Sequence, residues 1–303
     1  MAGVSAGKHR LMRLATYASL LVALVLIGAK AFAWLGTDSV AMLSSLIDSI
    51  LDAVASLLNL FAVRQALTPA DAEHRFGHGK AEPLAGLGQA AFIAGSAVFL
   101  LFQAANRLLH PQAVSDGSVG VAVSLLSIAL ALLLVLFQRF VVRRTGSMAI
   151  GADALHYVSD LLSNLTVIVA LVLATRFGLP LADPLLAAGL ALFILYGAWR
   201  IFHRAYDHLM DREFPDEVRA TIRRLVMEQP QVRALHDLRT RSSGTSSFIQ
   251  MHLELDADMT LAEAHRVSDA VEAVLLKSFP DAEVIIHQDP AGLDESQPHF
   301  AAS

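Results

Sequence analysis

The chain of 303 residues has no cysteine and little charge, since only 17% of its residues are Asp, Glu, Lys or Arg. Without cysteine it forms neither disulfides nor thiolate metal sites, so any metal must be bound by imidazole or oxygen donors. No dense basic run is present and the net charge is -5, so nothing in the charge points to nucleic acid as a partner. A hydrophobic content of 55% and a mean hydropathy of +0.53 indicate an integral membrane protein.

Long apolar runs fill the first two thirds of the chain. A spanning helix needs about 20 mostly apolar residues. The sequence contains six such runs, at roughly residues 12–35, 38–66, 84–108, 117–142, 147–175 and 182–202. From about residue 208 onward charged residues are frequent and apolar runs are short, as in a soluble domain. We therefore expect a six-helix transmembrane domain over residues 1–207, a soluble domain over residues 208–291 and a disordered tail over residues 292–303.

Lysine and arginine are distributed unevenly between the two sets of connections. One set contains Lys8, Arg10, Arg13, Arg75, Lys80, Arg139, Arg143, Arg144, Arg200 and Arg204. The opposite connections, at residues 36–38, 110–118 and 176–180, contain only Arg176. Because positively charged loops stay on the cytoplasmic side, we expect both termini and the soluble domain to be cytoplasmic.

Two of the runs share a pattern of ionisable residues. SVAMLSSLIDSILD at residues 39–52 aligns without gaps on SMAIGADALHYVSD at residues 147–160, which pairs Asp48 with His156 and Asp52 with Asp160. In the expected topology the second run crosses the membrane inward and the fifth outward. Opposed repeats of this kind are typical of transporters whose binding site lies between two inverted halves.

The four paired residues are expected to meet near the middle of the membrane. Each pair lies about 9 to 14 residues into its helix, or about 14–21 Å into a hydrocarbon layer about 30 Å thick. A spacing of four residues places both members of a pair on one helix face. The sequence therefore predicts a four-ligand site made of Asp48, Asp52, His156 and Asp160.

A cluster of carboxylates inside a membrane requires a counter-charge. One ionised carboxylate at the bilayer centre costs at least about 2.5 kcal/mol, and neighbouring carboxylates repel each other. A divalent cation resolves both problems, and this donor set suits tetrahedral Zn²⁺ best, with Cd²⁺, Fe²⁺, Co²⁺ or Mn²⁺ also compatible. Metal and protons compete for the same lone pairs, as an antiporter requires. His156 is the first candidate proton carrier because histidine titrates near neutral pH.

A structural role for these polar residues is the alternative. Single carboxylates could serve only to hold the bundle together through hydrogen bonds to Asn59, Ser163 or Asn164. For Asp153, one helical turn before His156, we expect an access-path or capping role instead of ligation.

The motifs DSILD, HYVSD and FGHGKAE, the last at residues 76–82, resemble those of the cation diffusion facilitator family. The resemblance extends from the first run through DLRTR at residues 237–241 and VIIHQDP at residues 284–290. It implies a homodimeric, proton-coupled exporter of Zn²⁺, Cd²⁺ or Fe²⁺ in the lipid of a bacterial inner membrane. It also implies a cytoplasmic α/β domain with a metallochaperone-like, ferredoxin-like fold, and metal ligation by the four intramembrane residues.

The resemblance implies two further features outside the intramembrane site. The first is a metal site at Asp71, His74 and His78, between the second and third runs; the spacing suits one side of a helix, but the flanking glycines favour a turn. A merely solvated loop is the alternative. The second is a charge pair between Lys80 and Asp211 that braces the dimer; the alternative is an exposed pair worth about 0–1 kcal/mol.

The soluble domain reads as helix, strand, strand, helix, strand, with helices at residues 215–229 and 260–278 and a last strand at residues 283–287. This order predicts an open α/β sheet with both helices on one face. In FIQMHLEL, alternation puts Ile249, Met251, Leu253 and Leu255 on the core face and His252 on the other.

Several histidines of this domain form a candidate regulatory metal site. By alternation His287 and Asp289 share a face, and His265 lies on the polar side of its helix with Asp269. A bridging Asp289 could join two metal ions, one held by His236 with His252 and one by His265 with His287. The resemblance implies such a two-zinc site near the dimer contact. Surface histidines without metal are the alternative.

We therefore expect a transporter and not an enzyme. An intramembrane metal hydrolase is a rival, but the sequence has no HExxH and leaves no separate general base or oxyanion donor. A membrane-anchored metal sensor is a second rival. Its function would survive the loss of Asp52 or Asp160 and would be lost with His287.

Overall fold

The computed structural model describes residues 2–37, 40–109, 121–179, 181–244 and 246–292. These residues form two compact units, a membrane unit over Ala2–Leu209 and a C-terminal unit that begins at Met210. Most of the predicted tail at residues 292–303 lies outside the described residues, as do parts of the predicted connections at residues 36–38 and 110–118.

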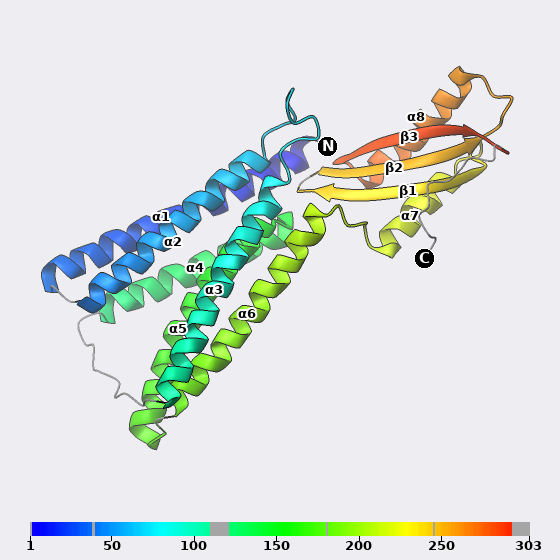
Figure 1. Cartoon of the computed structure of the whole chain (residues 1–303). Helices are drawn as coiled ribbons and strands as arrows, with labels where there is room; N and C mark the ends of the chain where they lie inside the picture. The colour runs from blue at the N-terminus through cyan, green and yellow to red at the C-terminus, as the bar shows by residue number, and fades with distance from the viewer. Residues whose placement is uncertain (1, 38–39, 110–120, 180, 245, 293–303) are drawn as a thin grey trace. The chain divides into compact units, whose positions relative to one another are not determined.

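The membrane unit consists of long helices (Figure 1). They are α1 (Ala2–Thr37), α2 (Val40–Ala66), α3 (Ala81–Leu109), α4 (Val121–Thr145), α5 (Met148–Phe177) and α6 (Ala182–Leu209). All of these except α5 contain a stretch that is long and apolar enough to cross a membrane, and α5 matches them in length with 30 residues. Large apolar side chains such as Phe32, Phe102 and Leu133 are exposed along these helices, as on a lipid-facing surface. The predicted six-helix membrane bundle is confirmed.

The helices of the membrane unit pack in neighbouring groups. In Figure 1, α1 runs along α2 and crosses α4, while α3 runs along α6 with α5 against both. Gly197 in α6 lies so close to α5 that a Cβ there would come within 2.8 Å of the Leu155 side chain. Small residues permit such close helix contacts in membranes. This contact holds the first third of α5, next to His156, against α6.

The C-terminal unit contains α7 (Asp216–Met227), β1 (Ala234–Ser243), β2 (Ser246–Leu255), α8 (Leu261–Ser278) and β3 (Ala282–Pro290). The sheet order is β1-β2-β3, with β1 antiparallel and β3 parallel to β2. The parallel pair needs a crossover connection, which α8 supplies. The predicted order of helices and strands is confirmed.

The core of the C-terminal unit lies on one face of the sheet. Ile249, Met251, Leu253 and Leu255 of β2 are buried and pack with residues of α7 and α8 in one apolar cluster. At the start of α8, the side chain of Thr260 accepts a hydrogen bond from the backbone N–H of Glu263 in a capping box. Both helices cover the face opposite His252, as the alternation predicts.

Candidate metal sites

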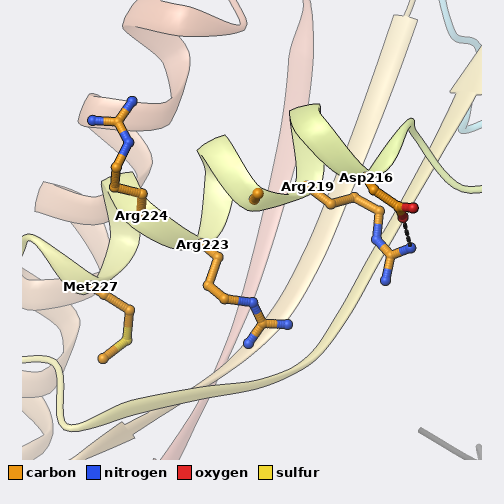
Figure 2. Close-up of a pocket in the computed structure, with 6 residues that line it drawn as sticks. Asp216, Arg219, Arg223, Arg224 and Met227 are labelled. Atoms are coloured by element: carbon orange, nitrogen blue, oxygen red, sulfur yellow. Dashed lines mark hydrogen bonds and ion pairs between the residues drawn. The ribbon is translucent and has the colours of Figure 1, made fainter. Parts of the chain in front are cut away.

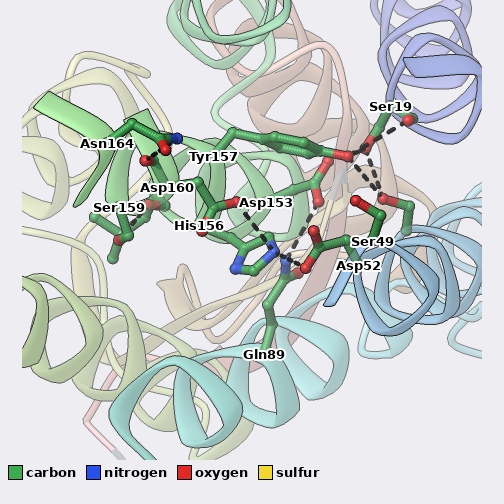
Figure 3. A network of polar contacts seen from close by, with 12 residues as sticks. Ser19, Ser49, Asp52, Gln89, Asp153, His156, Tyr157, Ser159, Asp160 and Asn164 are labelled. Atoms are coloured by element: carbon green, nitrogen blue, oxygen red, sulfur yellow. Dashed lines mark hydrogen bonds and ion pairs between the residues drawn. The ribbon is translucent and has the colours of Figure 1, made fainter. Parts of the chain in front are cut away.

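Asp52 of α2 meets His156 and Asp160 of α5 inside the membrane unit. One ligand atom from each of the three lies within 4.8 Å of the others. Nε2 of His156 is 2.9 Å from Oδ1 of Asp52 and 3.7 Å from Oδ2 of Asp160. Figure 3 shows the imidazole directed at Asp52. Two helices that are distant in sequence thus supply one group of donors that can bind a cation.

Asp48 lies outside this three-residue group. It is exposed and precedes Asp52 by one turn of α2. The spacing keeps it on the same side of the helix. Its ligation of a metal stays a prediction, because it does not belong to the group of three whose ligand atoms lie within 4.8 Å of one another.

Asp153 is buried and accepts hydrogen bonds from two neighbouring helices; it is not a helix cap. Its side chain is 1% exposed and accepts hydrogen bonds from Nε2 of Gln138, at 2.6 Å, and Nε2 of Gln89, at 3.3 Å. The N-cap of α5 is Ser147, whose hydroxyl accepts from the backbone N–H of Ile150. The expected capping role of Asp153 is therefore wrong. Its carboxylate instead ties α3 and α4 to α5 one turn before His156.

The hydrogen-bonding alternative accounts for little of the cluster. Asn164 donates to the backbone carbonyl of Asp160, not to the carboxylate. Asn59 is 3% exposed, and neither amide atom has a hydrogen-bond partner among the described residues. Asn59 lines a cavity of about 380 Å³ between α2 and α3 together with Gln89 and Phe92. The ring of Phe92 in turn lies 6.2 Å from that of His156.

Lys30 is a charged residue near the site that the sequence reasoning missed. Its Nζ donates to the backbone carbonyl of Ser45, at 3.1 Å, and to Oγ of Ser49, at 2.6 Å. A lysine inside the first apolar run was the available signal, because ionisable residues inside a membrane are costly and usually functional.

The loop between α2 and α3 brings Asp71, His74 and His78 together. One ligand atom from each lies within 4.8 Å of the others. The segment is a turn and not a helix, and Gly77 adopts a φ of 77°, so the glycine signal was correct. The backbone N–H of His74, aided by that of Glu73, lowers the pKa of Asp71. The loop therefore presents an ionised carboxylate beside two imidazoles.

In the C-terminal unit a row of histidines crosses the sheet. His252 of β2 is paired in register with His236 of β1 and with His287 of β3. The ring centroids are 5.1 Å apart for His236 and His252 and 4.6 Å apart for His252 and His287. Directly paired residues share a face. The row therefore lies opposite the apolar core.

Asp289 contacts all three histidines of this row. Its Oδ2 is 2.8 Å from Nδ1 of His252 and 3.3 Å from Nε2 of His236, while its Oδ1 is 3.1 Å from Nε2 of His287. The carboxylate is buried, at 4% exposure. The two oxygens thus face different histidines, as a bridging carboxylate requires.

The family models match both units. Residues 16–210 match the cation efflux transmembrane domain, and residues 214–291 match the cation efflux protein cytoplasmic domain. The chain belongs to the cation efflux family. The expected family resemblance is confirmed, and the chain is a membrane transporter for metal cations and not an enzyme.

Curated relatives extend over nearly the whole chain. The cation-efflux pump FieF of Pectobacterium atrosepticum is 50% identical over 281 residues, which are 93% of each chain. The FieF pump of Yersinia enterocolitica is 46% identical over 290 residues, which are 96% of each chain. Among solved structures, the metal-bound C-terminal domain of the CzcD transporter from Thermotoga maritima is 32% identical. It covers 26% of this chain and 93% of its own, with a TM-score of 0.25.

Three other predicted site residues lie apart from these groups. His265 is on α8, where its Nε2 is 3.7 Å from Oδ2 of Asp269, and it does not join the His/Asp groups found among the described residues. Lys80 belongs to the membrane unit and Asp211 to the C-terminal unit. Asp211 lies 3.5 Å from Nη1 of Arg241 and has a φ of 54°. The roles of all three stay predictions.

The C-terminal unit also has a shallow groove of about 370 Å³ on α7 (Figure 2). Its arginines already have partners. Arg219 bonds to Asp216, Arg224 bonds to Glu228, and Arg223 donates to the backbone carbonyl of Leu235. Two of the three guanidinium groups are thus paired with carboxylates, and the third donates to a backbone carbonyl.

Proposed function

We propose that this transporter exports Zn²⁺, or alternatively Cd²⁺ or Fe²⁺, from the cytoplasm across a bacterial inner membrane in exchange for protons. The metal is bound by Asp52, His156 and Asp160, with Asp48 as the fourth ligand. The observation that carries this proposal is the 2.9 Å contact between His156 on α5 and Asp52 on α2, with Asp160 in the same group. Imidazole and carboxylate donors gathered in an apolar bundle suit a transition-metal ion.

Proton exchange follows from the chemistry of these ligands. Each carboxylate or imidazole lone pair that binds the metal is no longer open to a proton, so metal binding expels protons and protonation expels metal. Protons that enter from the outer side would thus release the metal there. Each charge that crosses the membrane changes the free energy by about 2.3 kcal/mol per 100 mV. The inward proton gradient therefore provides a driving force for export.

Alternating access would require α2 and α5 to tilt against the rest of the bundle. These two helices contact each other much less than α1 contacts α2 or α3 contacts α6. The contact between Asp52 and His156 is one of two side-chain hydrogen bonds that join them among the described residues, beside that between Ser56 and Tyr157. Making and breaking this link as metal and protons exchange would open the site to one side at a time.

We assign a regulatory role to the second group, formed by His236, His252, His287 and Asp289, with His265 as the further ligand. Metal held by this group would stabilise the homodimer and shift the equilibrium between the two access states. The bridging position of Asp289 between the histidines supports two adjacent metal ions. Occupancy of the Asp71, His74 and His78 loop is a weaker, accessory proposal.

The test is zinc flux into lipid vesicles that contain the purified protein under an imposed pH gradient. The wild type should move zinc against its concentration gradient, and Asp52→Ala should not. Asp258→Ala, the same chemical change at an exposed turn of the C-terminal unit, should transport like the wild type. Equal flux in Asp52→Ala and the wild type would refute the intramembrane site. Loss of flux in His287→Ala but not in Asp52→Ala would favour the sensor alternative.

A further inference from the structure

Lys30 is a cation held inside the membrane unit. It lies in α1, within an apolar helix that is long enough to span the membrane. A lysine in such a segment ordinarily extends its side chain to the membrane surface. Here Nζ is instead hydrogen-bonded to α2, through the carbonyl of Ser45 and the hydroxyl of Ser49. Ser49 is itself buried, at 1% exposure.

The two contacts hold the ammonium next to the segment of α2 that carries the proposed metal ligands. The ammonium is not itself a metal ligand. Ser49 precedes Asp52 by three residues and follows Ser45 by four, so these three residues lie on one face of α2. The carboxylates that act electrostatically on Lys30 are those of Asp52, Asp48 and Asp160. The positive charge is therefore held, from a third helix, against the part of α2 that carries Asp48 and Asp52.

Lys30 changes the net charge of the proposed metal site. Three ionised carboxylates with one fixed ammonium carry two net negative charges, which a single divalent cation neutralises. Without Lys30 the metal-loaded site would remain negative in a medium of low dielectric constant, where unbalanced charge is costly. With Lys30 the incoming metal is also repelled by a like charge, which weakens its binding.

We propose that Lys30 is a positioning and affinity-setting residue for transport, which makes the loaded site neutral and keeps metal binding weak enough for release. This inference rests on the proposed intramembrane metal site. It assigns to α1 an electrostatic part in a site whose ligands come from α2 and α5. The alternative is that Lys30 only links α1 to α2 through its hydrogen bonds. Loss of such a link would weaken metal binding, while loss of a repelling charge would strengthen it.

The experiment is equilibrium binding of zinc to the full chain in lipid nanodiscs. All samples carry His78→Ala, His252→Ala and His287→Ala, which remove one proposed ligand from the loop group and two from the C-terminal group. Lys30→Met removes the charge and keeps the length of the side chain. Lys30→Gln also removes the charge but keeps a hydrogen-bond donor for Ser45 and Ser49. Lys30→Arg keeps the charge, and Ser49→Ala removes one hydrogen bond without changing any charge.

Both neutral variants should bind zinc about tenfold more tightly or better, since like charges repel strongly in a low-dielectric site. Vesicle transport at saturating zinc should become slower in these variants because release is slower. Lys30→Arg and Ser49→Ala should stay close to the parent. Unchanged or weaker binding in Lys30→Gln, which retains the link to α2, would overturn the proposal for Lys30. If Asp52→Ala binds zinc as well as the parent, the intramembrane site itself is wrong.

Discussion

The intramembrane and C-terminal groups use the same two residue types on different scaffolds. Asp52, His156 and Asp160 come from two helices that touch each other little, inside a unit with an apolar surface. His236, His252 and Asp289 come from adjacent strands of one hydrogen-bonded sheet. The ligand chemistry is alike, but only the second group comes from elements that are joined by backbone hydrogen bonds.

This difference indicates how each group can act. In a β-ladder, register fixes which side chains meet, so the histidine row is already formed before any metal arrives. Between helices in a membrane, a ligand set can be made and broken by a tilt of one helix. The first arrangement suits stable metal binding, and the second suits transport.

The largest expected effect is at the intramembrane group. Asp160→Ala removes a ligand and leaves His156 and Asp52 without their third partner. Transport should fall at least about 100-fold. This loss exceeds the roughly 10–100-fold losses that are typical when a partner of a metal ligand, and not the ligand itself, is removed. Zinc flux into vesicles measures this, with Asp258→Ala at an exposed turn of the C-terminal unit as the matched control. Flux above a tenth of the parent value would show that Asp160 is not a ligand.

A core substitution tests whether the C-terminal unit unfolds independently of the membrane unit. Leu253 is fully buried between the sheet and its helices, so Leu253→Ala should lower the stability of the C-terminal unit by about 2–5 kcal/mol. Proteolysis of the full chain in increasing denaturant measures the loss, which should be confined to residues beyond 210. Zinc binding to the intramembrane group should persist. Equal loss in the membrane unit would contradict the independence of the two units.

Removing a ligand from the C-terminal group should affect dimer formation more than zinc flux. His252→Ala removes the central histidine of the row and should weaken zinc binding there by about tenfold or more. Analytical ultracentrifugation in detergent should then show a dimer that zinc no longer tightens, while vesicle flux stays measurable. If the mutant dimer still tightens with zinc as the parent does, regulation through this group is wrong.

The smallest effect concerns the start of α8. Thr260→Ala removes the N-cap and should cost about 0.5–2 kcal/mol in unfolding free energy. The Thr260 side chain lowers the pKa of Glu263. Because that pKa is depressed, the stabilisation is present above the ordinary pKa of glutamate and is lost as the pH falls through the folded value. The gap between the denaturation curves of the parent and Thr260→Ala should therefore narrow in acid, where Thr260 no longer donates to an ionised carboxylate, while the bond from the backbone N–H of Glu263 to Thr260 remains. A gap that stays constant with pH would contradict this coupling.

Sequence patterns were sufficient for the elements and for which candidate ligands share a face. Run length identified the spanning helices, because bilayer thickness sets helix length. Alternation in β2 separated His252 from the core, because successive strand residues face opposite sides. The spacing of four residues put His156 and Asp160 on one helix face for a similarly local reason.

Contacts between distant segments required the tertiary structure. The alignment of His236, His252 and His287 depends on strand register, and the sequence reasoning had paired His287 with His265 instead. The partners of Asp153 and Lys30 come from other helices, so no local pattern shows them. The sequence by itself determined which residues are apolar, which face they occupy and which carry imidazole or carboxylate groups. Only the tertiary structure decided which of these charges meet, because helix packing and strand register depend on contacts along the whole chain.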